Sequence, residues 1–113
     1  MSFSSSEREG VLVIVMEGNI MGGPEAYPLR EFLHNAVQNG KKNIVIDLSH
    51  VVRVNSSGLG MLIGALTTMK NAGGSLKLAG ANETIQHLIS ITKLSSVFET
   101  YSTVDEAVSS YAR

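Results

Sequence analysis

Two adjacent serines, Ser56 and Ser57, have the residue type and the setting most suited to chemistry in this sequence. They follow Asn55 and precede Gly58, at a point where an apolar strand pattern gives way to an apolar helix pattern. The first turn of a helix leaves backbone N–H groups unpaired, and the helix dipole favours negative charge there. A hydroxyl at that position can therefore carry a phosphate group at little energetic cost. The rest of the chain offers little other chemistry, so the functional prediction depends on this loop.

The segment 55–58 also suits a plain helix cap, because Asn and Ser are preferred N-cap residues. Two features favour a function beyond capping. The loop follows a buried strand of an α/β sheet, where such folds place functional sites. The helix after it is also expected to present a flat, weakly charged face opposite its core stripe, which suits protein docking. The residues expected on that face are Met61, Gly64, Ala65 and Thr68. The alternative is that a neighbouring element packs on this face.

Catalytic and metal-binding patterns are weak. The three histidines, His34, His50 and His87, fall in different predicted elements and lack the spacing of a metal motif. Ser56 could be combined on paper with His50 and Asp47 as a triad, but no Gly-x-Ser-x-Gly elbow surrounds the serine. Asp47 is instead expected to end its strand and brace the following turn through side-chain hydrogen bonds.

Glycine-rich loops do not complete a nucleotide-binding motif either. Gly58-Leu59-Gly60 is followed by Ile63 where the dinucleotide fingerprint needs glycine, and no Gly-Lys-Ser/Thr occurs. The segment 22–24, Gly-Gly-Pro, is explained by turn formation. We therefore expect a protein that is not an enzyme and needs no cofactor and no metal.

The composition indicates one globular domain over residues 1–113. Apolar residues make up 43% and charged residues 17%, with a formal net charge of −1, so no basic surface for nucleic acid is expected. Cysteine is absent, which excludes disulfides and thiolate chemistry and fits a reducing compartment. The first ten residues are too polar for a signal peptide, and no apolar run approaches membrane-spanning length. We expect a small cytoplasmic domain.

Apolar, β-branched runs predict strands at 11–16, 43–48, 75–79 and 97–101, with 3–8 as a hairpin partner of the first. These strands alternate with apolar patterns of helical spacing. Short connections between such units favour parallel pairing, whereas the hairpin adds an antiparallel edge. The prediction is one α/β domain with helices covering a mixed sheet.

Helix starts and stops are marked by cap residues. The first helix is predicted to begin at Pro24 and to end at Gly40, and the second to end at Gly73. Asn82 is expected to cap the third helix. The segment 103–106 carries a capping-box signature for the fourth.

Three segments of the chain resemble the STAS domain, a family that includes the bacterial anti-sigma factor antagonists. They are Ile46-Asp47-Leu48-Ser49, Val54-Asn55-Ser56-Ser57-Gly58-Leu59-Gly60-Met61-Leu62 and Gly73-Gly74-Ser75-Leu76-Lys77-Leu78. The resemblance covers nearly the whole chain. It implies a four- to five-stranded mixed sheet with about four helices mainly on one side.

The resemblance also implies a function. In the family, an unphosphorylated antagonist binds an anti-sigma factor that is also a serine kinase, and phosphorylation releases it. A metal-dependent serine phosphatase then resets the cycle. Transferred to this chain, the acceptor is Ser56, with Ser57 as the alternative. The implied partner-binding residues are Met21, Asn55, Ser56, Ser57 and Gly58, together with Met61, Gly64, Ala65 and Thr68 of the following helix.

Two positions depart from the family pattern. Asn55 stands where the residue before the acceptor is usually Asp, and Met21 stands where a second Asp is usual. Asn55 can still cap the helix, but two negative charges that could orient a partner are missing. Two other functions stay open: a STAS subunit of a larger complex such as a lipid-transport ATPase, and a nucleotide-binding sensor. Weak homodimerisation also stays open.

Overall fold

A hairpin begins the chain in the computed structural model, which describes residues 2–112 and, among these, leaves out the side chain of Glu25. β1 (Ser2–Arg8) pairs antiparallel with β2 (Val11–Glu17) through a turn at Glu9 and Gly10. The predicted hairpin is confirmed. Its outer strand is exposed and serine-rich, whereas its inner strand is almost entirely buried.

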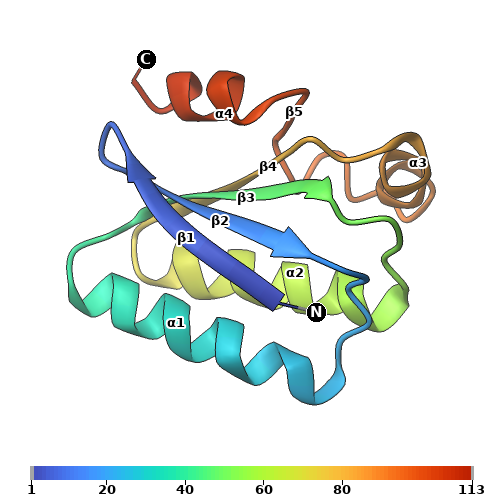
Figure 1. Cartoon of the computed structure of the whole chain (residues 1–113), viewed down its shortest axis with the longest axis horizontal. Coiled ribbons are helices and arrows are strands. Elements are labelled where there is room, and N and C mark those ends of the chain that lie inside the picture. Colours follow the sequence, from blue (N-terminus) through green and yellow to red (C-terminus); the bar gives the residue numbers. More distant parts are fainter. Residues whose placement is uncertain (1, 113) are drawn as a thin grey trace.

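The remaining strands join this hairpin in chain order to give one sheet, β1-β2-β3-β4-β5 (Figure 1). β3 (Asn43–His50), β4 (Ser75–Ala79) and β5 (Thr100–Tyr101) continue it, and each pairs in parallel with the strand before it. The sheet is therefore mixed, with one antiparallel edge. Parallel strands need crossover connections, and each of the three here contains a helix: α1, α2 and α3 in chain order.

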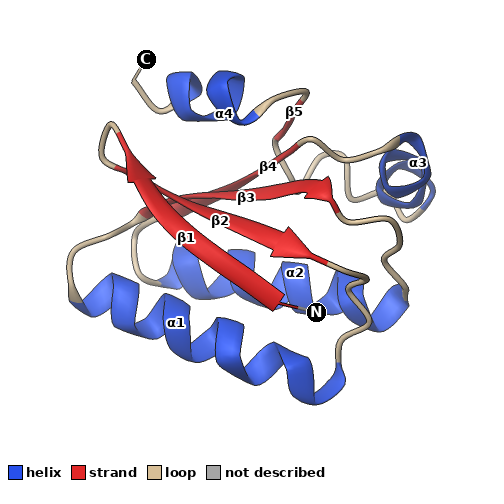
Figure 2. Cartoon of the chain, viewed as in Figure 1, coloured by secondary structure: helices blue, strands red, loops and turns tan. Residues whose placement is uncertain are grey.

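Helices cover both faces of the sheet unequally (Figure 2). A short 3-10 turn, η1 (Gly23–Glu25), leads into α1 (Ala26–Gln38), which lies beside α2 (Ser56–Asn71) on one face. α4 (Val104–Ser110) lies on the opposite face, and α3 (Glu83–Ile91) lies beyond the end of β3. The predicted four- to five-stranded mixed sheet with about four helices is confirmed, with five strands and four α-helices among the described residues.

The two faces of the sheet bury separate clusters because side chains alternate along each strand. On β3, Ile44 and Ile46 are fully buried in the main core shared with α1, α2 and α3. Val45, between them in sequence, belongs to the smaller cluster that Ala107 and Val108 of α4 close. Since both faces of β3 are buried, its sequence shows a continuous apolar run instead of alternation.

The last strand is much shorter than the predicted 97–101. Phe98 fills the main core, and it does so from a turn in which its own N–H and that of Val97 both donate to the Leu94 carbonyl. This bend keeps the chain out of the sheet until Thr100. The prediction read the apolar Val97 and Phe98 as strand residues, whereas their hydrogen bonds close a turn.

No helix within residues 2–112 combines the length and the apolarity needed to cross a membrane.

Candidate functional site: the loop at the start of α2

Asn55 caps α2 in the way that the sequence predicts. Its backbone is extended, with φ −94° and ψ −178°, and its Oδ1 accepts a hydrogen bond of 2.7 Å from the Gly58 N–H. Its carbonyl oxygen accepts a second bond, of 2.8 Å, from the Leu59 N–H. The amide side chain therefore satisfies the helix terminus without bringing a negative charge to it.

Ser56 and Ser57 are the first two residues of α2, and both are exposed. The first turn of α2 contains no acidic residue. Arg53 is the charged residue next to the loop in sequence, and it is also exposed. A phosphate on either hydroxyl would thus lie at the positive end of the helix dipole, with no carboxylate in the first turn of its own helix.

A second segment, the loop after β2, is joined to this site by backbone contacts. Ile20 forms an isolated parallel bridge with Val54, its N–H donates to the Arg53 carbonyl at 3.0 Å, and its carbonyl accepts from the Asn55 N–H at 3.3 Å. Met21 follows directly and is half-buried. The structure thus brings together the predicted residues Met21 and Asn55, although 34 positions separate them in the sequence.

Gly58 is required by the closeness of these two segments. A Cβ atom at this position would lie 1.9 Å from the carbonyl oxygen of Ile20. Any side chain would therefore force the two loops apart. The glycine of the Ser-Ser-Gly motif thus has a packing role at the crossing of the two loops.

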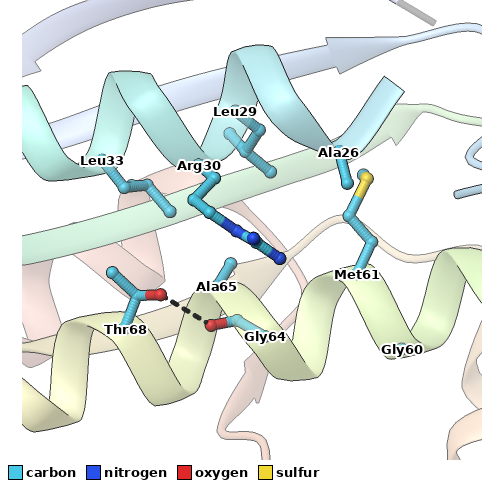
Figure 3. A pocket seen from close by; sticks show the side chains of 9 residues that line it. All are labelled: Ala26, Leu29, Arg30, Leu33, Gly60, Met61, Gly64, Ala65 and Thr68. Atoms are coloured by element: carbon cyan, nitrogen blue, oxygen red, sulfur yellow. Dashed lines mark hydrogen bonds between the residues drawn. The ribbon is translucent and has the colours of Figure 1, made fainter. Parts of the chain in front are cut away.

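The predicted docking face of α2 is only partly exposed. Met61 and Ala65 are buried, with 9% and 6% of their surface accessible, because α1 packs directly over them. Figure 3 shows these side chains facing Leu29 and Leu33 of α1 across a small pocket of about 50 Å³. The expectation that both lie on an open face is therefore wrong. The alternative, a neighbouring element packed on that face, holds for these two residues.

The remaining two residues of that predicted face are accessible. Gly64 is exposed and Thr68 is half-exposed, and the Thr68 hydroxyl donates to the Gly64 carbonyl at 3.0 Å (Figure 3). Arg30 of α1 extends across the pocket towards this stretch of α2. The open part of α2 is therefore narrower than predicted, and a cationic side chain borders it.

The other candidate chemistry is not assembled. Asp47 is buried within β3, and its Oδ1 accepts a hydrogen bond of 2.9 Å from the Ser49 N–H, which confirms the predicted brace. The strand does not end there, however, but continues to His50. No group of three or more potential metal ligands occurs within the part of the chain that the structure describes.

Sequence reasoning missed the part played by Ile20 and Gly22, which hold the loop after β2 against the start of α2. Gly22 appeared only as a turn residue. The contacts of Ile20 and Gly22 with α2 link segments that are far apart in the chain, so no local sequence pattern predicts them. The unusual density of glycine at 18, 22 and 23 was the one available signal that backbone comes close to backbone in this region.

Comparisons with known proteins agree with this geometry. A family model described as "STAS domain" matches residues 2–107. The anti-sigma-B factor antagonist of Bacillus subtilis is 34% identical over 84 residues, which cover 72% of this chain and 76% of that protein.

Solved structures show the same fold. The Thermotoga maritima protein TM1081 superposes with a TM-score of 0.87 at 22% identity, covering 98% of this chain and 95% of its own. The phosphorylated form of SpoIIAA, a Bacillus cell fate determinant, gives a TM-score of 0.73 at 18% identity, covering 97% and 99%.

Proposed function

The chain belongs to the STAS domain family, and we propose that it acts as an anti-sigma factor antagonist whose binding to its partner is switched by phosphorylation of Ser56. The observation that carries the proposal is an exposed serine in the first turn of a helix whose start is held firmly by the loop after β2. The name of the Bacillus subtilis relative supports the antagonist role. The two forms of SpoIIAA, unphosphorylated and phosphorylated, support a phosphate-dependent state within this fold.

Ser56 is the better acceptor of the two serines. The backbone and the Cβ of Ser57 lie against Gly22 of the loop after β2, so this residue is partly engaged by its own domain. Ser56 precedes that contact and is exposed at the helix start. A kinase that must surround the acceptor hydroxyl has more room at Ser56.

The switch follows from local electrostatics. A phosphate adds about −1.5 to −2 charges at pH 7 and is tolerated at a helix N-terminus. At a docked interface the same group introduces charge and bulk where a neutral hydroxyl had fitted. A loss of about 3 kcal/mol of binding free energy raises a dissociation constant roughly 150-fold. The switch requires no rearrangement of the core.

The partners of such a cycle are an anti-sigma factor that is also a serine kinase and a metal-dependent serine phosphatase, all in the cytoplasm. The contact surface comprises Met21, Asn55, Ser56 and Ser57, and continues along α2 to Gly64 and Thr68. Gly58, which the sequence placed on this surface, is buried against the Ile20 carbonyl and is not part of it. Met61 and Ala65 support this surface from beneath, since α1 covers them. Asn55 and Met21 leave it without a carboxylate, and Arg30 and Arg53 lie beside it, so a partner meets neutral hydrogen-bonding groups next to two cationic side chains.

The test uses the anti-sigma kinase encoded in the same genome. The chain and its Ser56→Ala and Ser57→Ala variants are incubated with that kinase and ATP, and intact mass is measured. We expect the mass of one phosphate on the wild type and on Ser57→Ala, and none on Ser56→Ala. Retention of the phosphate by Ser56→Ala would contradict the assignment.

Binding is measured in parallel with wild type, Ser56→Ala and Ser56→Asp baits on native lysate. A partner retained by the first two and lost by the Asp bait supports the switch. Thermal unfolding of the three proteins controls for folding. We expect Ser56→Ala to unfold close to the wild type, because residue 56 is exposed, and Ser56→Asp to unfold at the same or a slightly higher Tm, because it adds a negative charge at the helix start.

The absence of both carboxylates favours a second candidate, a STAS subunit that binds constitutively in a larger complex such as a lipid-transport ATPase. In that case binding is indifferent to Ser56→Asp, and an ATPase subunit is the captured protein. The same capture experiment therefore separates the two functions.

A further inference from the structure

Gly22 has a backbone conformation that side chains rarely permit. It precedes η1 with φ +78° and ψ −151°, a region of the backbone map occupied almost only by glycine. The residue is buried, although it lies in a loop. Glycine adopts this conformation without strain, whereas any other residue would be strained there.

The contact that fixes it is the start of α2. A Cβ atom at Gly22 would lie 2.7 Å from both the carbonyl carbon and the carbonyl oxygen of Ser57, and 2.8 Å from the Ser57 Cβ. Cβ atoms do not approach other atoms within 3.0 Å. The Gly22 backbone therefore packs directly on the peptide that follows Ser57, in the first turn of the helix.

The next residue of α2, Gly58, makes a second close approach to the loop after β2. Gly58 meets the Ile20 carbonyl so closely that its Cβ would be 1.9 Å from the oxygen. The loop after β2 thus touches α2 at two successive places through glycines, one from each segment. Together with the hydrogen bonds of Ile20, these contacts leave the first turn of α2 little freedom to shift.

We infer that Gly22 is a positioning residue for Ser56: the close packing of its backbone on Ser57 sets where the first turn of α2 presents the Ser56 hydroxyl to the kinase. The inference rests on the proposed function for its last step. A methyl group at position 22 pushes on the carbonyl group and the Cβ of Ser57, the residue next to Ser56. A small displacement of a reacting group is costly for a transfer reaction that depends on alignment.

Gly23 provides a matched control. It also has a positive φ, +70°, but a Cβ added there would have no other atom within 4 Å. Gly23→Ala therefore introduces the same methyl group and a strained backbone in the neighbouring position without the contact. Gly22→Asn is a second test variant, because it brings the same Cβ with a short polar side chain that can form local hydrogen bonds.

The first measurement needs no partner. Amide hydrogen exchange is followed by NMR for Gly58, whose N–H is bonded to the Asn55 side chain, and for Leu78 in the sheet as a reference for global opening. We expect Gly58 exchange, relative to Leu78, to accelerate about tenfold in Gly22→Ala and Gly22→Asn. Gly23→Ala should stay close to the wild type. Equal Gly58 exchange in the wild type and both Gly22 variants overturns the inference.

The second measurement connects position to function. With the anti-sigma kinase and ATP, kcat/KM for Ser56 phosphorylation is expected to fall about tenfold or more in the Gly22 variants and little in Gly23→Ala, at a temperature where all are folded. If Gly22→Ala does not fold, Gly22→Asn decides. A wild-type chain that is never phosphorylated defeats the proposed function and, with it, the link to Ser56, whereas altered exchange with unaltered kcat/KM defeats the positioning role alone.

Discussion

The loop at the start of α2 and the region under α4 hold their polar groups in opposite ways. Backbone contacts of Ile20 and Gly58 fix the start of α2, and the side chains of Ser56 and Ser57 are exposed to solvent. Under α4, side-chain contacts fix the helix to the sheet. The first region thus leaves hydroxyl groups open to solvent, whereas the second pairs its polar groups within the chain.

The region under α4 is centred on Lys77, which is buried in β4. Its ammonium donates to Ser110 Oγ at 2.7 Å, lies 3.2 Å from Glu99 Oε2, and lies 4.1 Å from the centre of the Tyr111 ring. The Tyr111 hydroxyl in turn donates to the Ile44 carbonyl at 2.7 Å. A buried ammonium is stable only with such partners, so these contacts anchor the last helix to the sheet.

Burial of a charged group need not indicate a functional site. Lys77 is the most buried cation of the described chain, yet its hydrogen bonds and ring contacts are all internal. Ser56 is exposed and chemically ordinary, yet it lies in a helix turn whose backbone is held by the loop after β2. Accessibility on a fixed scaffold is the property that a partner can use.

The largest effect is expected from disrupting the backbone contacts between the loop after β2 and the first turn of α2. Gly58→Ala places a methyl group against the Ile20 carbonyl, and we expect it to destabilise the fold by about 3 kcal/mol in urea unfolding. Gly64→Ala is the control on the same helix, where an added Cβ meets nothing within 4 Å. That variant should gain about 0.5–1 kcal/mol, because alanine favours helix over glycine. Equal effects of the two variants would show that the loop crossing is not held tightly.

An intermediate effect is expected from breaking a side-chain anchor under α4. Tyr111→Phe removes the hydrogen bond to the Ile44 carbonyl, and we expect a loss of about 1 kcal/mol at pH 8. Burial raises the pKa of Tyr111 above the ordinary value of 10.0. The wild-type contribution is thus fully present below pH 10 and declines as the pH rises towards the folded-state pKa. Urea unfolding of both proteins at pH 8 and above pH 10 should show their stability difference shrinking.

The smallest effect is expected from a substitution that changes a side chain and keeps the backbone contacts between the loop after β2 and α2. Asn55→Asp keeps the cap on the Gly58 N–H and adds a negative charge at the start of α2. We expect stability to rise by about 0.3–1 kcal/mol at low salt and the gain to fade as salt is added. Thermal unfolding at two salt concentrations measures this. A clear loss of stability would contradict the view that the loop is held mainly through its backbone.

Local chemistry was predicted well from the sequence. Asn55, Asn82 and Thr103 all cap their helices through the hydrogen bonds expected of them. Each cap depends only on residues within three positions, so a short sequence window contains the whole cause. The apolar runs of β2, β3 and β4 were equally clear, because strands buried on both faces are mostly apolar.

Contacts between distant segments set the limits of prediction. Met61 and Ala65 are buried because α1 packs on α2. The sequence of α2 alone does not reveal whether another helix packs on it. Phe98 reaches the core from a turn, which an apolar run does not distinguish from a strand. The packing of Gly22 on Ser57 joins two loops that meet only in the folded sheet.

The outer edge of β1 has a consequence for the protein at high concentration. As the first strand of the sheet, β1 has one backbone edge without a partner strand over its seven residues. Four of these residues are serines, and the strand ends at Glu7 and Arg8, which pair with Lys41 and Asp105 of the same chain. A foreign strand added there would gain backbone hydrogen bonds but bury little apolar surface. The serine-rich edge therefore discourages open-ended growth of the sheet by added strands.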